Sequence, residues 1–191
     1  MLKIVTAPNP ILSQTAESIT KIDSFILRLI QEMKQTLIAA KDPEGVGLAA
    51  PQVGKSLRLF IVKPTPKSPI QVFINPKIID VIQTNLENNM SVKSPRRSST
   101  TKLEGCLSLP GIWGKVFRSP KITINYLDEK NKPHTRKFTG LLSIIAQHEI
   151  DHLNGILFPK RVLEQKQTLY KSKKNEKGED IFEEIDLTSN I

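Results

Sequence analysis

The first clear hydrophobic periodicity in the chain lies in residues 23–40. Apolar residues recur there with the three- and four-residue spacing of one helix face, at Phe25, Ile26, Leu29, Met33, Leu37 and Ala40. Asp23 or Ser24 precedes the first of these positions, and both residue types cap helix N-termini. The pattern therefore predicts an amphipathic helix over residues 23–40.

Short segments rich in β-branched and aromatic residues predict the strands. They lie at residues 57–63, 71–76, 115–119 and 121–128, and a further short strand ends at Phe138. The sequence DEKNK supplies a turn before this last strand. Because strands and helices occupy separate stretches, the order predicts an α+β fold with mixed or antiparallel sheets.

A second helix is predicted from Thr139, which can cap it, to Gly155, where a left-handed residue can end it. Between them runs GLLSIIAQHEIDHLN, in which His148 and His152 are four residues apart. Residues at this spacing project from one face of a helix, about 5 to 6 Å apart at Cβ. The pair can therefore hold one metal ion, beside apolar residues of the same face.

The remaining segments are polar. Residues 83–102 hold almost no large apolar group, which predicts an exposed insertion. The tail, residues 163–191, contains GEDIFEEIDL, which is typical of a short strand. With 38% hydrophobic and 25% charged residues, the chain has the composition of one soluble globular domain spanning residues 1–191.

The formal net charge of +9 comes largely from SVKSPRRSST and KQTLYKSKKNEK, which indicates solvated surface and leaves room for a polyanionic partner. With seven Phe, two Tyr and one Trp, the chain has no basic stripe interleaved with aromatic residues, so sequence-specific nucleic-acid binding is not expected. No apolar run approaches the roughly 18 to 20 residues that span a membrane. A single cysteine fits a reducing compartment, and we expect a cytoplasmic protein.

Two histidines leave a catalytic metal short of a ligand, because such sites have about three protein ligands and one open position. The strongest candidate for the third ligand is Cys106, in EGCLSLP. Gly105 precedes it and permits close approach of the backbone. The expected ligand set is one thiolate and two imidazoles.

Three segments together resemble the signature motifs of the peptide deformylase family. They are GVGLAAPQ (45–52), EGCLS (104–108) and QHEIDHLNG (147–155), in this order, and the likeness extends over most of residues 1–163. The resemblance implies sheets packed around a central HExxH helix. It also implies a metal-dependent hydrolase that removes the formyl group from the N-terminal methionine of new proteins and releases formate.

The resemblance also implies roles for single residues. One divalent ion per chain would be bound by Cys106, His148 and His152. Fe²⁺ is expected in the cell, and Zn²⁺, Ni²⁺ or Co²⁺ can replace it. Glu149 would act as the general acid and base. Gln52 and the backbone N–H of Leu107 would donate hydrogen bonds to the oxyanion.

Further residues follow from the same positions. Gly47 and the neighbouring backbone would hold the substrate peptide as an added strand. The substrate-binding set, including the walls of an apolar pocket for the methionine side chain, would be Gly45, Val46, Gly47, Leu141, Ile144 and Ile145. Glu104 would support the ligands, and Arg118 would pair with Asp151 to buttress the helix.

The expected partners are N-formylmethionyl nascent peptides and, transiently, the ribosome. Two other interpretations compete. A zinc endopeptidase uses the same HEIDH helix, but it usually takes a histidine or glutamate downstream as its third ligand, whereas this chain offers Cys106 upstream. A non-enzymatic basic module would lack a ligand, Glu149 or Gln52, and all of these are present.

Overall fold

The structure is a computed structural model that describes residues 1–41, 44–82, 103–175 and 180–186. The predicted exposed insertion, residues 83–102, lies outside the described residues. None of the described helices has the length and apolar character needed to cross a membrane.

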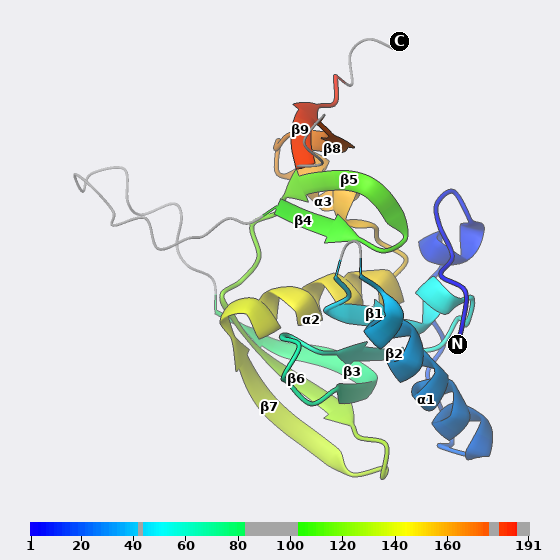
Figure 1. The fold of residues 1–191 in the computed structure, drawn as a ribbon. Helices are drawn as coiled ribbons and strands as arrows, with labels where there is room; N and C mark the ends of the chain where they lie inside the picture. The colour runs from blue at the N-terminus through cyan, green and yellow to red at the C-terminus, as the bar shows by residue number, and fades with distance from the viewer. Residues whose placement is uncertain (42–43, 83–102, 176–179, 187–191) are drawn as a thin grey trace.

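Two antiparallel sheets form the framework (Figure 1). The five-stranded sheet has the order β1-β2-β3-β6-β7, with β1 Gly47–Ala49, β2 Leu59–Val62, β3 Gln71–Val81, β6 Lys121–Leu127 and β7 Pro133–Thr139. The four-stranded sheet has the order β4-β5-β8-β9, with β4 Leu103–Cys106, β5 Leu109–Lys115, β8 Leu169–Lys174 and β9 Asp180–Glu184. Together with the helices, these sheets confirm the predicted α+β fold.

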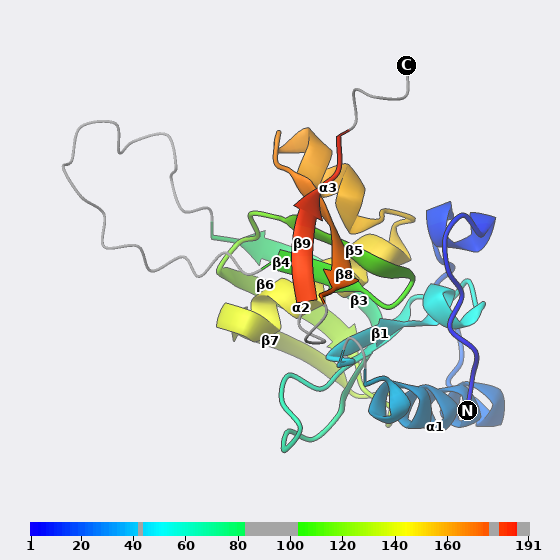
Figure 2. The ribbon, with the colours of Figure 1, turned by 45° about the horizontal axis from the view of Figure 1, so that its top comes forward.

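The helices fill the space around the sheets. They are α1 Ser24–Ala39, α2 Gly140–Leu153 and α3 Phe158–Glu164, and the short 3₁₀ helices are η1 Pro10–Ser13 and η2 Ala50–Val53. In Figures 1 and 2, α1 lies beside β1 and β2, whereas α2 runs between the two sheets in Figure 1. The HExxH segment is therefore central in the fold, as the resemblance implied.

Side-chain alternation along β2 explains why this sheet is covered on both faces. Phe60 and Val62 belong to the core that includes Ile145 and Ala146 of α2. Leu59 and Ile61 belong to the core on the α1 side, with apolar residues of that helix. Successive strand residues point to opposite faces, so a strand buried on both sides is apolar throughout.

The first predicted helix agrees closely with α1. Of the two proposed caps, Asp23 is the residue used: its side chain accepts a hydrogen bond from the N–H of Ile26 at 3.1 Å. Gly155 follows α2 with φ of +68°, the left-handed conformation predicted for the end of that helix. Thr139 stands at the N-cap of α2 but makes no side-chain capping hydrogen bond there.

One predicted strand is wrong. Of residues 115–119, only Lys115 belongs to a strand, β5, and residues 116–119 lie outside every strand. The backbone groups of Phe117 bond instead to the side chain of Gln165, at 2.7 Å for the N–H and 3.1 Å for the carbonyl. The side-chain amide of Gln165 thus takes the place of a neighbouring strand at Phe117, although the apolar pattern of residues 115–119 is typical of a strand.

Candidate metal centre

The thiol of Cys106 meets the histidine pair of α2. Cys106 ends β4, and its Sγ lies 3.2 Å from Nε2 of His152. One ligand atom from each of Cys106, His148 and His152 lies within 4.8 Å of the other two. Because one thiolate and two imidazoles leave a coordination position open, this donor set fits a catalytic divalent ion.

The two imidazoles differ in their surroundings. Nδ1 of His148 contacts Oε2 of Glu104 at 3.0 Å, which leaves Nε2 as the nitrogen available to a metal ion. Burial lowers the pKa of His148, but hydrogen bonds to Cys106 and Glu104 outweigh it and raise this pKa to about 10. Burial, together with the charge of His148, lowers the pKa of His152. Metal binding should therefore release a proton at His148, whereas His152 is already neutral.

Glu149 is a buried carboxylic acid beside these ligands. It is 3% exposed, and within the described ranges its Oε2 has no hydrogen-bond partner. Burial raises its pKa from 4.5 to about 7, against the opposing effects of His148 and Arg118. A carboxyl group with a pKa near neutrality is suited both to accept and to donate a proton.

Glycine at position 47 is what allows Glu149 to lie there. A Cβ atom at Gly47 would come within 2.8 Å of Cδ of Glu149 and 2.9 Å of Cγ2 of Ile145. Both distances are below those of real Cβ contacts, so a side chain would displace its neighbours. The strand β1 and the helix α2 therefore approach each other closely because residue 47 is glycine.

Gln52 reaches the same cluster from η2. Its Oε1 accepts a hydrogen bond from the N–H of Ala49 at 2.8 Å. This contact orients the amide so that Nε2 donates to Sγ of Cys106 at 3.5 Å and to Oγ of Ser108 at 3.3 Å. Leu107 follows Cys106 in the turn between β4 and β5. Both expected oxyanion donors thus lie next to Cys106, through the Gln52 contact and through the chain.

The expected substrate-binding residues divide by exposure. Gly45, Gly47 and Ile145 are buried, Ile144 is half-buried, and Val46 and Leu141 are exposed. β1 is an edge strand, because it pairs with β2 alone in the five-stranded sheet. Of the exposed apolar residues, Val46 directly precedes this strand, whose second edge pairs with no described strand, and Leu141 lies in the first turn of α2.

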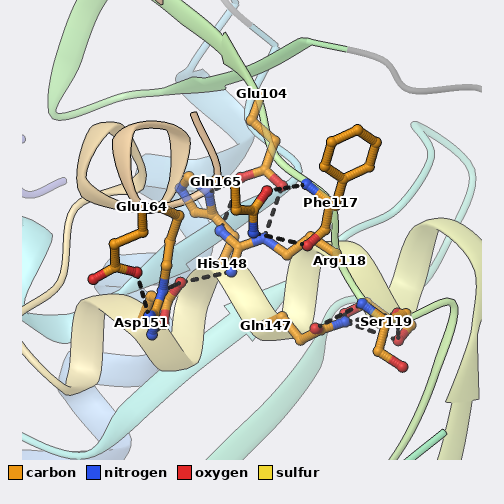
Figure 3. Close-up of polar contacts among 11 residues, drawn as sticks. Glu104, Phe117, Arg118, Ser119, Gln147, His148, Asp151, Glu164 and Gln165 are labelled. Atoms are coloured by element: carbon orange, nitrogen blue, oxygen red, sulfur yellow. Dashed lines mark hydrogen bonds and ion pairs between the residues drawn. The ribbon is translucent and has the colours of Figure 1, made fainter. Parts of the chain in front are cut away.

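A network of charged side chains lies on the Nδ1 side of His148 (Figure 3). Glu104 accepts hydrogen bonds from Nε and an Nη of Arg118, at 2.8 and 2.9 Å. Arg118 also donates to Oδ2 of Asp151 at 2.6 Å. Two guanidinium nitrogens of Arg161 donate to Asp151 at 2.8 and 3.2 Å. We call these four residues, Glu104, Arg118, Asp151 and Arg161, the Glu104 network.

The network keeps Glu104 ionised. Burial alone raises the pKa of Glu104, but hydrogen bonds from Arg118 and His148 outweigh it and lower this pKa to about 2. The carboxylate therefore stays charged at neutral pH. A charged acceptor holds the imidazole of His148 more firmly than a neutral one.

Several contacts of the site were not expected from the sequence. The N–H of Val5 bonds to the carbonyl of Gln52 at 2.8 Å, and the N–H of Ala7 bonds to the carbonyl of Ser108 at 3.0 Å, so the N-terminal segment joins two motifs. Arg161 was also missed. Nothing in its local pattern separates it from the neighbouring Lys160, because its partner Asp151 is reached only in the folded chain.

A HExxH helix whose two histidines meet an upstream cysteine is the arrangement expected of a metal-dependent hydrolase. A family model described as polypeptide deformylase matches residues 1–168, and the chain belongs to this family. The peptide deformylase of Chlorobaculum parvum is 40% identical over 167 residues, which cover 85% of this chain and 80% of the relative. That of Desulfotalea psychrophila is 35% identical over 177 residues, 91% of this chain and 94% of the relative.

Solved structures give the same result. The peptide deformylase of Thermotoga maritima superposes with a TM-score of 0.70 at 31% identity, covering 84% of this chain and 97% of that one. The enzyme of Synechococcus elongatus, solved in complex with actinonin, superposes with a TM-score of 0.68 at 35% identity, covering 84% of this chain and 78% of that one. The resemblance noted in the three motifs is therefore confirmed along most of the chain.

Proposed function

We propose roles for the residues of the metal centre in the reaction of this enzyme, which removes the formyl group from an N-terminal methionine and releases formate. Cys106, His148 and His152 hold one divalent ion. The observation that supports this is their close cluster of ligand atoms, within 4.8 Å of one another, beside the buried carboxyl group of Glu149. When bound, such an ion activates a water molecule and polarises the formyl carbonyl.

Fe²⁺ is the ion that we propose for the cell. Thiolate and imidazole ligands suit both Fe²⁺ and Zn²⁺, and Ni²⁺ and Co²⁺ can take the same donors. Metal analysis of protein purified without oxygen tests this assignment. Predominant zinc in such protein would contradict it, whereas about one iron per chain would support it.

Glu149 moves the proton. Its carboxylate takes a proton from the attacking water, whose oxygen forms a bond to the formyl carbon. It then gives this proton to the methionine nitrogen as the carbon–nitrogen bond breaks, so that formic acid and a free amine leave, and the acid ionises to formate. The pKa of about 7 supports both halves of this cycle, because neither transfer is strongly uphill near neutral pH.

Gln52 and Leu107 stabilise the oxygen that becomes negative during the attack. The Nε2 group of Gln52 is held beside Cys106 by the Ala49 contact, so it needs little rearrangement to donate to that oxygen. The backbone N–H of Leu107 is the second donor. Donors already in place stabilise charge better than water, which must reorient.

The substrate is a formylmethionyl peptide emerging from synthesis. Its backbone pairs at Gly45, Val46 and Gly47, that is, with the two residues before β1 and with the edge of β1 that pairs with no described strand. Its methionine side chain contacts the apolar face of α2. The wall on this face consists of Leu141, Ile144 and Ile145. We further propose that the enzyme meets its substrates in the cytoplasm through transient contact with the ribosome.

The direct test measures formate release from formyl-Met-Ala-Ser by metal-loaded protein. A folded, loaded preparation that releases no formate above background would contradict the activity. The endopeptidase alternative predicts cleavage inside a peptide blocked at both ends, which a deformylase leaves intact. Actinonin, which the Synechococcus elongatus enzyme binds, should inhibit formate release.

A further inference from the structure

Arg161 lies on α3, the short helix that follows α2. Its Nε donates to Oδ2 of Asp151 at 3.2 Å, and one Nη donates to Oδ1 at 2.8 Å. Its other Nη donates to Glu164 at 3.0 Å, on the more exposed side of the helix. Arg161 thus makes a bidentate contact with Asp151, which fixes the plane of that carboxylate.

Asp151 in turn contacts Arg118, which is more deeply buried than Arg161. Its Oδ2 is shared between Arg161 and Arg118, and the contact to Arg118 is 2.6 Å. The side chain of Arg118 is 6% exposed, and its three nitrogens all donate to carboxylates of the network. Without Arg161, Asp151 would keep a single arginine contact and could rotate about it.

The inner end of the network, Glu104, contacts the proposed metal ligand His148. Glu104 takes two hydrogen bonds from Arg118 and contacts Nδ1 of His148 through Oε2. In Figure 3, Arg118 lies between Glu104 and Asp151, and His148 lies below Glu104. The series of contacts is therefore continuous from the surface of α3 to the imidazole.

Solvent reaches the outer part of this network. A cavity of about 320 Å³ borders Arg118, Asp151 and Arg161. The side chain of Arg161 is 32% exposed, against 9% for Asp151. A shorter, neutral side chain at position 161 would admit water to compete for the carboxylate of Asp151, which loosens the orientation of Arg118.

We propose that Arg161 is a positioning residue for His148, acting through the Glu104 network. Its hydrogen bonds go to Asp151 and Glu164, and not to the proposed ligands or to Glu149. The inference rests on the proposed role of His148 as a ligand. Its effect should be smaller than the roughly 10- to 100-fold loss that follows when a direct partner of a ligand is removed, because Arg161 is further from the imidazole.

The experiment compares three variants loaded with Zn²⁺. In Arg161→Gln, metal should pass to a chromogenic chelator about 3- to 10-fold faster than in the wild type, a fraction of the effect of losing a ligand's direct partner. The kcat for formyl-Met-Ala-Ser should fall in parallel, whereas KM should not change. Arg161→Lys keeps the charge without the bidentate contact, so its rate of metal release should lie between those of the wild type and Arg161→Gln.

Glu164→Gln is the matched control. Glu164 contacts Arg161 on the exposed side, and it has no part in the Glu104 network. This variant should release metal at the wild-type rate. A purely stabilising role for Arg161 would lower the unfolding temperature of Arg161→Gln and leave metal release from folded protein unchanged, and that result would overturn the proposal.

A double variant tests the route. If Arg161 acts through Asp151, Arg161→Gln should add nothing to the metal release of Asp151→Asn, whereas additive effects would exclude this route. Failure of the proposed function is a separate result. It would appear as a wild-type enzyme without formate release, and the comparison of metal release between variants would still decide the role of Arg161.

Discussion

On one face of α2, Glu149 is 3% exposed, and among the residues with described positions its Oε2 has no hydrogen-bond partner. Two residues later, about 200° around the helix, Asp151 is 6% exposed and both of its oxygens accept hydrogen bonds from arginines. The two side chains are buried to nearly the same extent, and they differ in their hydrogen-bond partners. Glu104, which shares Arg118 with Asp151, has its pKa lowered to about 2 by Arg118 and His148, whereas burial raises the pKa of Glu149 to about 7.

This contrast separates two uses of a buried carboxyl group. A carboxylate with complete cationic partners is held in place and keeps its charge. One without them can change its protonation state near neutral pH, which is what proton transfer requires. The protein therefore places Glu149, the proposed proton-transfer acid, on one side of α2 and the Glu104 network on the other.

Replacing the reactive acid gives the largest expected effect. Glu149→Gln should lower the rate of formate release about 10²- to 10⁴-fold, because an amide cannot accept the proton of the attacking water. Metal content, measured by elemental analysis, should stay at the wild-type level. Glu164→Gln, the same change in an exposed pair, should keep full activity. Wild-type turnover by metal-loaded Glu149→Gln would remove the basis of the contrast.

The raised pKa of Glu149 predicts a pH dependence of stability in chelator-treated protein. The unfolded carboxyl group ionises near 4.5, whereas the folded one keeps its proton up to about 7. The contribution of Glu149 to the free energy of unfolding is therefore fully present below pH 4.5 and is lost as pH rises toward 7. Above pH 7, Glu149→Gln should be more stable than the wild type by at most about 3 kcal/mol.

Urea unfolding of both proteins at pH 4, 5.5 and 8 measures this difference. The wild type and the variant share all other titrating groups, so subtraction isolates Glu149. A difference in unfolding free energy that stays constant over this pH range would show that the folded carboxyl group is not desolvated as its burial indicates.

Gly47→Ala tests the position of the same acid without changing its chemistry. The new methyl group would press on Glu149 and Ile145, and a displacement of about 1 Å can lower a rate by about 10²-fold. Gly45→Ala is the matched control for kcat, because its methyl group would meet Leu37 and Ala40 instead of Glu149, and its proposed contact with the substrate backbone would alter KM. The kcat of formate release should fall mainly in the first variant, and an equal fall in both would point to general disruption of the loop.

Glu104→Gln tests the Glu104 network. It should weaken metal binding about 10- to 100-fold in chelator competition, because His148 loses its charged partner. The folded pKa of about 2 lies below the unfolded value of 4.5, so the stabilisation from Glu104 is present above pH 4.5 and is lost as pH falls toward 2. The stability gap between wild type and variant should close over that interval. Glu129→Gln, in a half-buried pair with Lys34 that is remote in sequence from the metal-site motifs, should change neither property.

Local pattern was enough for the long elements. The helix predicted over residues 23–40 is observed as Ser24–Ala39. Four of its predicted apolar positions, Ile26, Leu29, Met33 and Leu37, are buried in the core, whereas Phe25 is 52% exposed. The pattern did not predict α3, which has only seven residues and buries Phe158 and Val162 alone. A proline in its first turn was the available signal. Two apolar positions are too few to establish a helical period.

The sequence by itself determined that His148 and His152 share one helix face, because the 3.6-residue period is a property of local backbone hydrogen bonding. The three motifs also indicated the family. Only the tertiary structure decided that Cys106, 46 residues before His152, lies 3.2 Å from it. It also decided that Arg161 reaches Asp151. These contacts depend on how sheets and helices pack to bury their apolar faces, and no local period encodes that packing.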